Sequence, residues 1–143
     1  MKISELEEML ESDLAVVKDN LFQASIDTPV LHSKWMKFST DEAYKLHILK
    51  QRMSKLKKAK WEYYGHKANE RIYEKQPFNL KLTKGEIPMY LDADDDIQRL
   101  SREVMQQEML VNRLAEAVKS IQFRHTNIKN AIEWQKLTVG EVV

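Results

Sequence analysis

The chain has 143 residues, of which 31% are charged, with only three glycines, three prolines and a formal net charge of +1. This composition favours long helices over a turn-rich fold. The absence of cysteine excludes disulfides, thiolate metal sites and cysteine nucleophiles. No stretch is apolar enough for a transmembrane helix, and the N-terminus is acidic rather than a signal core. We therefore expect a cytosolic protein that does not contact a membrane.

The N-terminal residues predict a short amphipathic helix. Ser4 and Glu7 have the spacing of a capping box, and the helix should end near Val16. Seven acids lie within residues 1–28. They could shield a basic part of the same chain, contact a neighbouring subunit, or form a solvated face. The apolar positions at helical spacing are Ile3, Leu6, Leu10 and Leu14.

Two further helices are expected before Gly65. Thr28 followed by Pro29 is typical of an N-cap with proline at the first helical position, so a second short helix should run through Trp35. Ser39 and Glu42 again have capping-box spacing and predict a third helix, over about 40–64.

Residues 66–91 have no helical periodicity. The alternating segment 78–82 and the nearby Gly85 and Pro88 predict a small arm, either irregular or a β-hairpin. Between Asp94 and Gly140 there is no glycine or proline, which predicts a helix of about 40 residues.

This last helix carries a heptad pattern, which predicts packing against copies of itself or against the helix at 40–64 in a hairpin. His125 occupies one heptad position and would be a polar residue that sets the register. The expected fold is mainly α, an elongated helical hairpin or coiled coil. Residues 1–92 would hold the basic helix and the arm, and 93–143 the oligomerisation helix, in a single structural unit. The predicted oligomerisation residues are Ile97, Leu100, Val104, Val111, Leu114, Val118, Ile121, Ile128 and Ile132.

The most informative segment is a run from Lys45 to Lys60 that holds seven basic residues and no acid, followed by Trp61-Glu62-Tyr63-Tyr64. Clustered cations bind phosphates and aromatic faces stack on bases, so this combination favours single-stranded nucleic acid. The alternatives are a solvated face and an acidic protein partner. The candidate nucleic-acid-binding residues are Lys50, Arg52, Lys55, Lys57, Lys58, Lys60, Trp61 and Tyr64.

The sequence indicates no catalytic residues, no metal and no cofactor. Phosphate-binding loops and nucleophile motifs are absent, and the four histidines lack paired spacing. Asp92, Asp94, Asp96 and Glu103 fit part of a calcium-loop pattern, but Ile97 stands where glycine is required. Acids at a helix N-terminus explain these residues better. We expect a binding protein rather than an enzyme.

Three motifs make the chain resemble the UvsY family, the recombination mediators of tailed bacteriophages. They are 31–35 (Leu-His-Ser-Lys-Trp), 56–64 (Leu-Lys-Lys-Ala-Lys-Trp-Glu-Tyr-Tyr) and 72–75 (Ile-Tyr-Glu-Lys). Residues 66–92 depart from the family in spacing, with Pro77, Gly85 and Pro88.

The resemblance implies a homo-oligomeric ring, a hexamer or heptamer, in the host bacterial cytoplasm. The resemblance also implies three partners: single-stranded DNA, a phage RecA-like recombinase and the phage single-strand-binding protein. A member of the family would help the recombinase to replace the single-strand-binding protein on the DNA. The family's DNA motif maps onto Lys58, Ala59 and Lys60, with Tyr63 and Tyr64 behind; Lys60 stands where arginine is expected. The alternative is a coiled-coil assembly or chaperone-like structural protein, of the prefoldin kind, without DNA binding.

Overall fold

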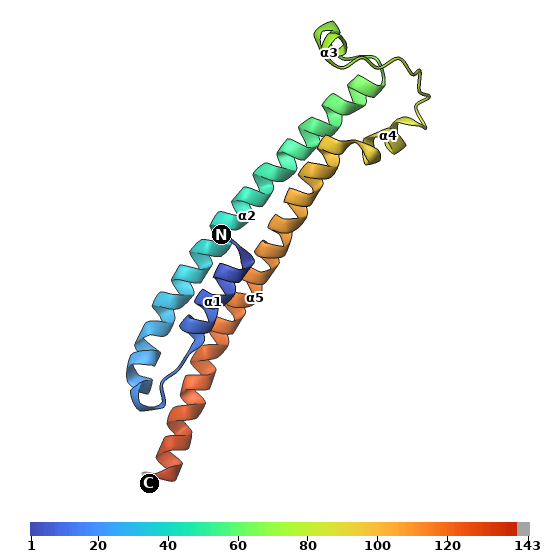
Figure 1. Cartoon of the computed structure of the whole chain (residues 1–143). Coiled ribbons are helices and arrows are strands. Elements are labelled where there is room, and N and C mark those ends of the chain that lie inside the picture. Colours follow the sequence, from blue (N-terminus) through green and yellow to red (C-terminus); the bar gives the residue numbers. More distant parts are fainter. Residues whose placement is uncertain (140–143) are drawn as a thin grey trace. The chain divides into compact units, whose positions relative to one another are not determined.

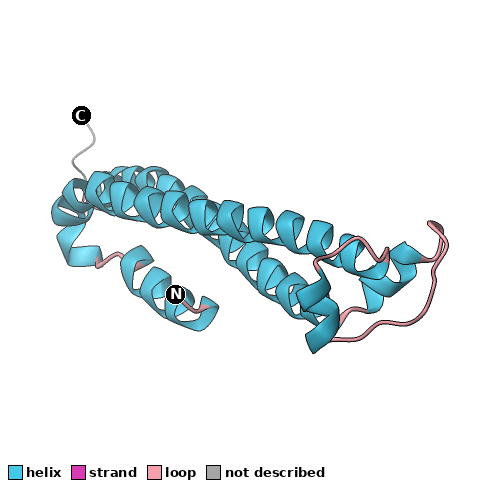
Figure 2. Cartoon of the chain, turned by 90° about the horizontal axis from the view of Figure 1, so that it is seen from above, coloured by secondary structure: helices cyan, strands magenta, loops and turns pink. Residues whose placement is uncertain are grey.

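A computed structural model describes residues 1–139 of the chain, and this part is mainly helical, without any β-strand (Figure 2). None of its helices combines the length and the apolar character that a membrane crossing requires. The elements are α1 (Ile3–Leu14), the 3-10 helix η1 (Lys18–Asn20), α2 (Leu21–Tyr64), α3 (Glu70–Lys75), α4 (Ile87–Ala93) and α5 (Asp95–Thr138). Figure 1 labels the α-helices.

These elements form two compact units. Unit 1 contains residues 1–43 together with the described residues from Met109 onward, and unit 2 contains Tyr44–Glu108. Helices α2 and α5 contribute residues to both. Each unit therefore combines residues from both sides of position 92, where the sequence predicts a boundary.

Helix α1 occupies almost the range that its apolar spacing predicts, but its N-terminus differs. The Lys2 amide donates to the Glu5 carboxylate at 3.2 Å, and Lys2 is the N-cap residue. The predicted capping box at Ser4 and Glu7 is therefore wrong. Glu7 instead forms an ion pair with Arg113 of α5, within unit 1.

Helix α2 is a single helix where the sequence predicts two. Pro29 lies inside it and lacks the N–H that would bond to the Ser25 carbonyl, but Ser25 is exposed, so water can reach that group. The Thr28 hydroxyl donates to the Ala24 carbonyl at 2.8 Å instead of capping a new helix. Ser39 also lies in the helix interior. Both predicted starts, at Thr28 and at Ser39, are therefore wrong.

Helix α2 ends at Tyr64, as predicted. The residue with an unusual backbone conformation after this end is His66. His66 adopts a left-handed φ of 59°. Its amide donates to the Tyr63 carbonyl at 3.2 Å, and the Lys67 amide donates to the Glu62 carbonyl at 2.7 Å. These two bonds form a Schellman motif, which satisfies the last carbonyl groups of the helix.

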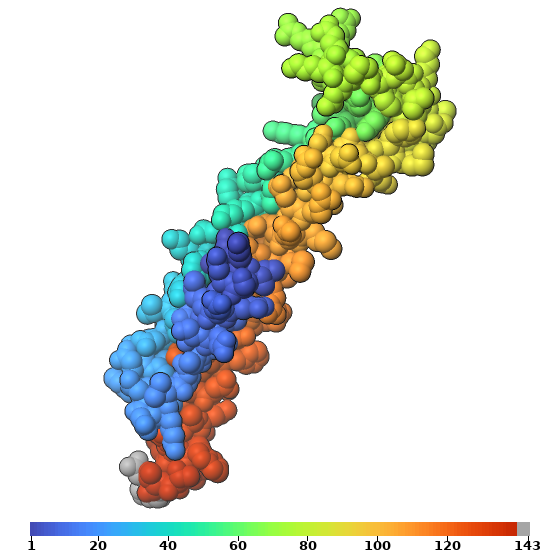
Figure 3. Space-filling model, in the orientation of Figure 1, coloured from blue at the N-terminus to red at the C-terminus, as the bar shows by residue number. Residues whose placement is uncertain are grey.

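The core of unit 1 joins α1, α2 and α5, and Figure 3 shows α1, in dark blue, lying over the other two helices there. Trp35 of α2 is completely buried, and its indole N–H donates to Asp13 at 2.9 Å. Lys34 donates to the same carboxylate oxygen at 2.7 Å. Acids of the first helix are thus partly used for ion pairs inside unit 1. The other core residues are Leu6, Leu110, Leu114, Ala117, Val118 and Ile121.

The buried stripe of α5 is wider than the predicted heptad positions. In unit 1 it also includes Leu110, Ala117 and Arg124, each one residue before a predicted position. A stripe this wide is expected because α5 packs on two helices there, whereas a coiled-coil pair needs a narrower one. His125 is exposed within the chain and the neighbouring Arg124 is buried, so His125 does not set the packing of α5 in unit 1; its role between copies of the chain stays a prediction. Six of the predicted oligomerisation residues are buried in the chain itself: Ile97, Leu100, Leu114, Val118, Ile121 and Ile128.

Residues 66–91 are not a β-hairpin. They include α3 and the start of α4, and segment 78–82 forms no strand. Aromatic rings hold this part of unit 2 together: the Tyr73 hydroxyl donates to the Tyr63 carbonyl at 2.8 Å, and the His66 ring lies 2.6 Å from the Leu80 carbonyl oxygen. Of the alternating segment, Phe78 packs among these rings, whereas Leu80 is exposed, so the alternation corresponds to no strand pairing. The neighbouring rings are those of Tyr63, Tyr64, His66, Tyr73, Phe78 and Tyr90.

Candidate nucleic-acid interface

The exposed side of α2 in unit 2 carries most of the predicted basic residues. Its opposite side is a half-buried stripe that includes Leu49 and Met53. The Lys58 side chain is 81% exposed and has only a 4.0 Å contact with Glu62. Lys50 lies 3.4 Å from Glu108, also at the surface. Surface pairs of this kind contribute little, so these cations remain available to a ligand.

Three more predicted residues lie on this surface without any ion pair in the described part of the chain: Arg52, Lys55 and Lys57. Together with Lys50, Lys58 and Trp61 they form what we call the basic surface. Trp61 is partly exposed, and the Lys67 ammonium lies 4.7 Å from the centre of its ring. One aromatic side chain is thus placed among cations, as a base-stacking site requires.

Lys60 is placed differently, because its ammonium group lies among acids. It is 2.8 Å from Asp96 and 3.2 Å from Asp94, and its side chain is only 16% exposed. Tyr64 donates its hydroxyl to the same oxygen atom of Asp94 at 2.6 Å. We call Lys60, Tyr64, Asp94 and Asp96 the Lys60 cluster. The structure therefore separates Lys60 and Tyr64 from the six residues of the basic surface.

Asp94 also caps α5. Its other oxygen accepts the amides of Asp96 and Ile97 at 2.9 and 3.1 Å. An aspartate in this position satisfies free N–H groups and stabilises the helix dipole. Asp94 and Asp96 thus have the helix-terminal role that the sequence predicts, whereas Asp92 lies in α4 and Glu103 in the interior of α5. Among the described residues, no group of three or more His, Asp or Glu is arranged to hold a metal ion.

The pKa shifts in the Lys60 cluster favour the charged forms of Lys60 and Asp94. Burial alone would raise the pKa of Asp94, but the hydrogen bonds from Tyr64, the Ile97 amide and Lys60 lower it below its ordinary value. Burial would lower the pKa of Lys60, but Asp96 and Asp94 raise it. Burial and the bond to Asp94 raise the pKa of Tyr64. At neutral pH the lysine and Asp94 are therefore both charged and satisfy each other.

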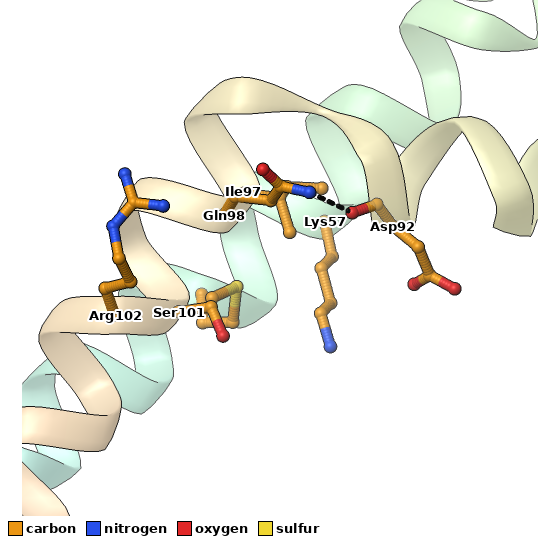
Figure 4. Close-up of a pocket in the computed structure, with 7 residues that line it drawn as sticks. Lys57, Asp92, Ile97, Gln98, Ser101 and Arg102 are labelled. Atoms are coloured by element: carbon orange, nitrogen blue, oxygen red, sulfur yellow. Dashed lines mark hydrogen bonds between the residues drawn. The ribbon is translucent and has the colours of Figure 1, made fainter.

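A pocket of about 370 Å³ lies beside the basic surface, within unit 2 (Figure 4). Gln98 donates its amide to the Asp92 carbonyl at 3.1 Å across one side of it. Sequence patterns did not indicate this site, because its residues come from three helices. The lining consists of Met53 and Lys57 of α2, Asp92 of α4, and Ile97, Gln98, Ser101 and Arg102 of α5.

Comparisons with known proteins agree with this fold. A family model described as "Recombination, repair and ssDNA binding protein UvsY" matches residues 9–141. Three crystal forms of the recombination mediator protein UvsY of bacteriophage T4 are similar in structure. The type II lattice has a TM-score of 0.85 at 19% identity and covers 97% of this chain and 98% of that chain. The type I lattice has a TM-score of 0.81 at 20% identity and covers 96% of this chain and 99% of that chain.

The type IV lattice has a TM-score of 0.80 at 19% identity and covers 99% of this chain and all of that chain (100%). No curated protein matches the chain in sequence. At these identities the structural likeness shows a shared fold. The family model spans nearly the whole chain, and the chain therefore belongs to the UvsY family.

Proposed function

We propose that this protein is a recombination mediator that binds single-stranded DNA through the basic surface of α2. In this proposal it helps a RecA-like phage recombinase to load in place of the phage single-strand-binding protein. Membership of a family described by recombination, repair and single-stranded DNA binding supports the proposal. No step in it requires catalysis by this chain.

The observation that carries the proposal is the unneutralised charge of α2. Arg52, Lys55 and Lys57 have no ion pair in the described residues, and Lys58 is exposed. Cations that are not interspersed with acids repel one another, and a polyanion relieves this repulsion while it releases its counterions. Contacts to phosphates carry no sequence information, so binding should be sequence-tolerant and strongly dependent on salt.

Several copies of the surface would strengthen binding. If chains assemble into a ring, each weak site adds to one continuous binding path, and avidity exceeds the affinity of one subunit. The heptad residues buried within the chain are poor candidates for contacts between subunits. Phe123 and Trp134, both 67% exposed, lie on one face of α5 and are better candidates.

We expect Phe123→Asp combined with Trp134→Asp to dissociate the oligomer without unfolding the subunit. Carboxylates in an apolar contact between subunits would be desolvated without a partner, whereas in the free subunit both positions face water. Sedimentation velocity measures the mass, and circular dichroism checks the helix content. An oligomer of unchanged mass would show that this face of α5 does not mediate assembly.

We expect Lys55→Ala combined with Lys58→Ala to lower the affinity for a fluorescent single-stranded oligonucleotide by about tenfold at low salt. Two lost phosphate contacts should also reduce the slope of log K against log salt by about 1.4, because each contributes about 0.7 on a single strand. Fluorescence anisotropy over a salt series measures both quantities.

The matched control for this experiment is Lys37→Ala combined with Lys129→Ala. It removes the same charge from exposed positions in unit 1, outside the basic surface. Its slope and affinity should stay close to those of the unaltered protein. If the unaltered protein does not bind single strands even at low salt, the mediator function is refuted, and a structural coiled-coil protein becomes the better description.

A further inference from the structure

The pocket of unit 2 offers the chemical groups that one nucleotide needs. Its volume of about 370 Å³ falls in the lower part of the range of small-molecule sites, roughly 300–1,000 Å³. Ile97 is buried and Met53 half-buried, and together they supply the apolar part of the lining. A methionine sulfur contacts aromatic rings favourably, so this part suits the face of a base.

The polar groups of the pocket are arranged around this apolar part. Ser101 contributes a hydroxyl and Gln98 an amide, both of which can bond to the edge of a base. In Figure 4, Lys57 and Ser101 point to the same side of the pocket, whereas Arg102 extends along α5 on the other side. Lys57 and Arg102 are exposed and have no ion pair within the described residues. Two cations therefore flank an apolar depression.

We infer that this pocket takes one nucleotide of a bound single strand. The base enters between Met53 and Ile97, and the phosphates on its two sides contact Lys57 and Arg102. Asp92 is the one acid in the lining and would repel a phosphate, which favours placing the phosphates near these two cations. The inference rests on the proposed function, because it gives the proposed strand a position.

This position extends the basic surface beyond α2. Lys57 belongs to the basic surface, and it lines the pocket together with residues of α5. A strand that follows the exposed side of α2 would therefore continue onto Ser101 and Arg102. Arg102 becomes a DNA-contacting residue that the charge pattern does not reveal, because Glu103 follows it and Arg99 nearby pairs with Asp96.

The test uses two variants and two strands, measured by anisotropy. Ser101→Phe should fill the pocket with a ring, and since Ser101 is exposed on α5 the helix can accept the change. Arg102→Ala removes one flanking cation. One oligonucleotide is normal and the other has the same backbone with abasic positions throughout its centre. The matched controls are Ser33→Phe and Arg71→Ala, both at exposed positions outside the pocket.

For Ser101→Phe we expect about a tenfold loss of affinity for the normal strand and less than about a twofold loss for the abasic strand, because the abasic strand places no base in the pocket. For Arg102→Ala we expect the salt slope to fall by about 0.7 on both strands. If both variants bind both strands like their controls, the pocket inference fails while the proposed function stands. If the unaltered protein binds neither strand, both fail.

Discussion

Replacing Lys60 with methionine is expected to lower the free energy of unfolding by about 3 kcal/mol, which is the cost of breaking a buried ion pair at the lower end of its range. The Asp94 side chain is 5% exposed, and without Lys60 its charge would keep only the bonds from Tyr64 and two amides. Methionine preserves most of the volume, so the loss reports mainly the electrostatic part. Urea unfolding followed by circular dichroism measures it.

The same variant separates two roles for Lys60. If Lys60 holds α2 to the start of α5 in unit 2, Lys60→Met should lose stability and keep its single-strand affinity at temperatures where it is folded. Lys55→Met should do the opposite, because Lys55 is exposed and has no ion pair in the described chain. A variant of Lys60 with unchanged stability and weakened DNA binding would instead give Lys60 the DNA-contacting role that the family motif implies.

A double-mutant cycle sharpens this test. Asp94→Asn removes the charge that Lys60 faces while an amide oxygen can still cap α5. If the two residues act as a pair, the loss in the double variant should be smaller than the sum of the two single losses. Additive losses would mean that Lys60 and Asp94 contribute to stability independently.

Replacing Arg124 with alanine is expected to destabilise unit 1 by about 3 kcal/mol. The guanidinium group is buried, and it donates to the Ala24 carbonyl at 2.9 Å and to the Thr28 hydroxyl at 2.5 Å. It also reaches the Ala15 carbonyl at 3.4 Å, at the end of α1. Hydrogen bonds from a charged donor contribute about 1.5–3 kcal/mol each to stability. Part of their loss is offset, because the alanine variant no longer has to bury a charge.

His125→Ala is the matched control, since His125 is the next residue on α5 and is exposed. In thermal or urea unfolding, the free energy of unfolding of His125→Ala should lie within about 0.5 kcal/mol of that of the unaltered protein. This pair of variants also distinguishes two registers of α5. If His125→Ala were the more damaging change, the predicted heptad position would describe the packing better than the structure does.

The sequence predicts the long helices because their signals are local. The absence of glycine and proline between Asp94 and Gly140 is enough to predict α5, and Gly65 is enough to predict that α2 ends near Tyr64. The false starts at Thr28 and Ser39 have the same origin, since residues that cap helices also occur inside them; the Thr28 hydroxyl, for example, bonds to the Ala24 carbonyl in the preceding turn. The burial of Trp35 in unit 1 supports an unbroken α2, and sequence patterns do not record such packing.

The candidate site was predictable in composition but not in detail. A run of cations without acids identifies the basic surface from the sequence alone. The contact of Lys60 with Asp94 and Asp96 joins residues that are more than thirty positions apart. Ser101 and Arg102 enter the pocket only because of how α5 lies against α2 in unit 2. Local periodicity cannot specify such pairings, so these residues required the structure.

His66, the residue with left-handed φ after the end of α2, connects this turn to the aromatic rings that follow it in the chain. Glycine would adopt the φ of His66 without steric cost, whereas a residue with a side chain pays on the order of 1 kcal/mol. The imidazole, however, stacks on Tyr73 and Phe78 and reaches the Leu80 carbonyl. The glycine exchange that usually improves a helix terminus would therefore remove the side chain that contacts Tyr73, Phe78 and the Leu80 carbonyl, and stability engineering of this protein should leave His66 unchanged.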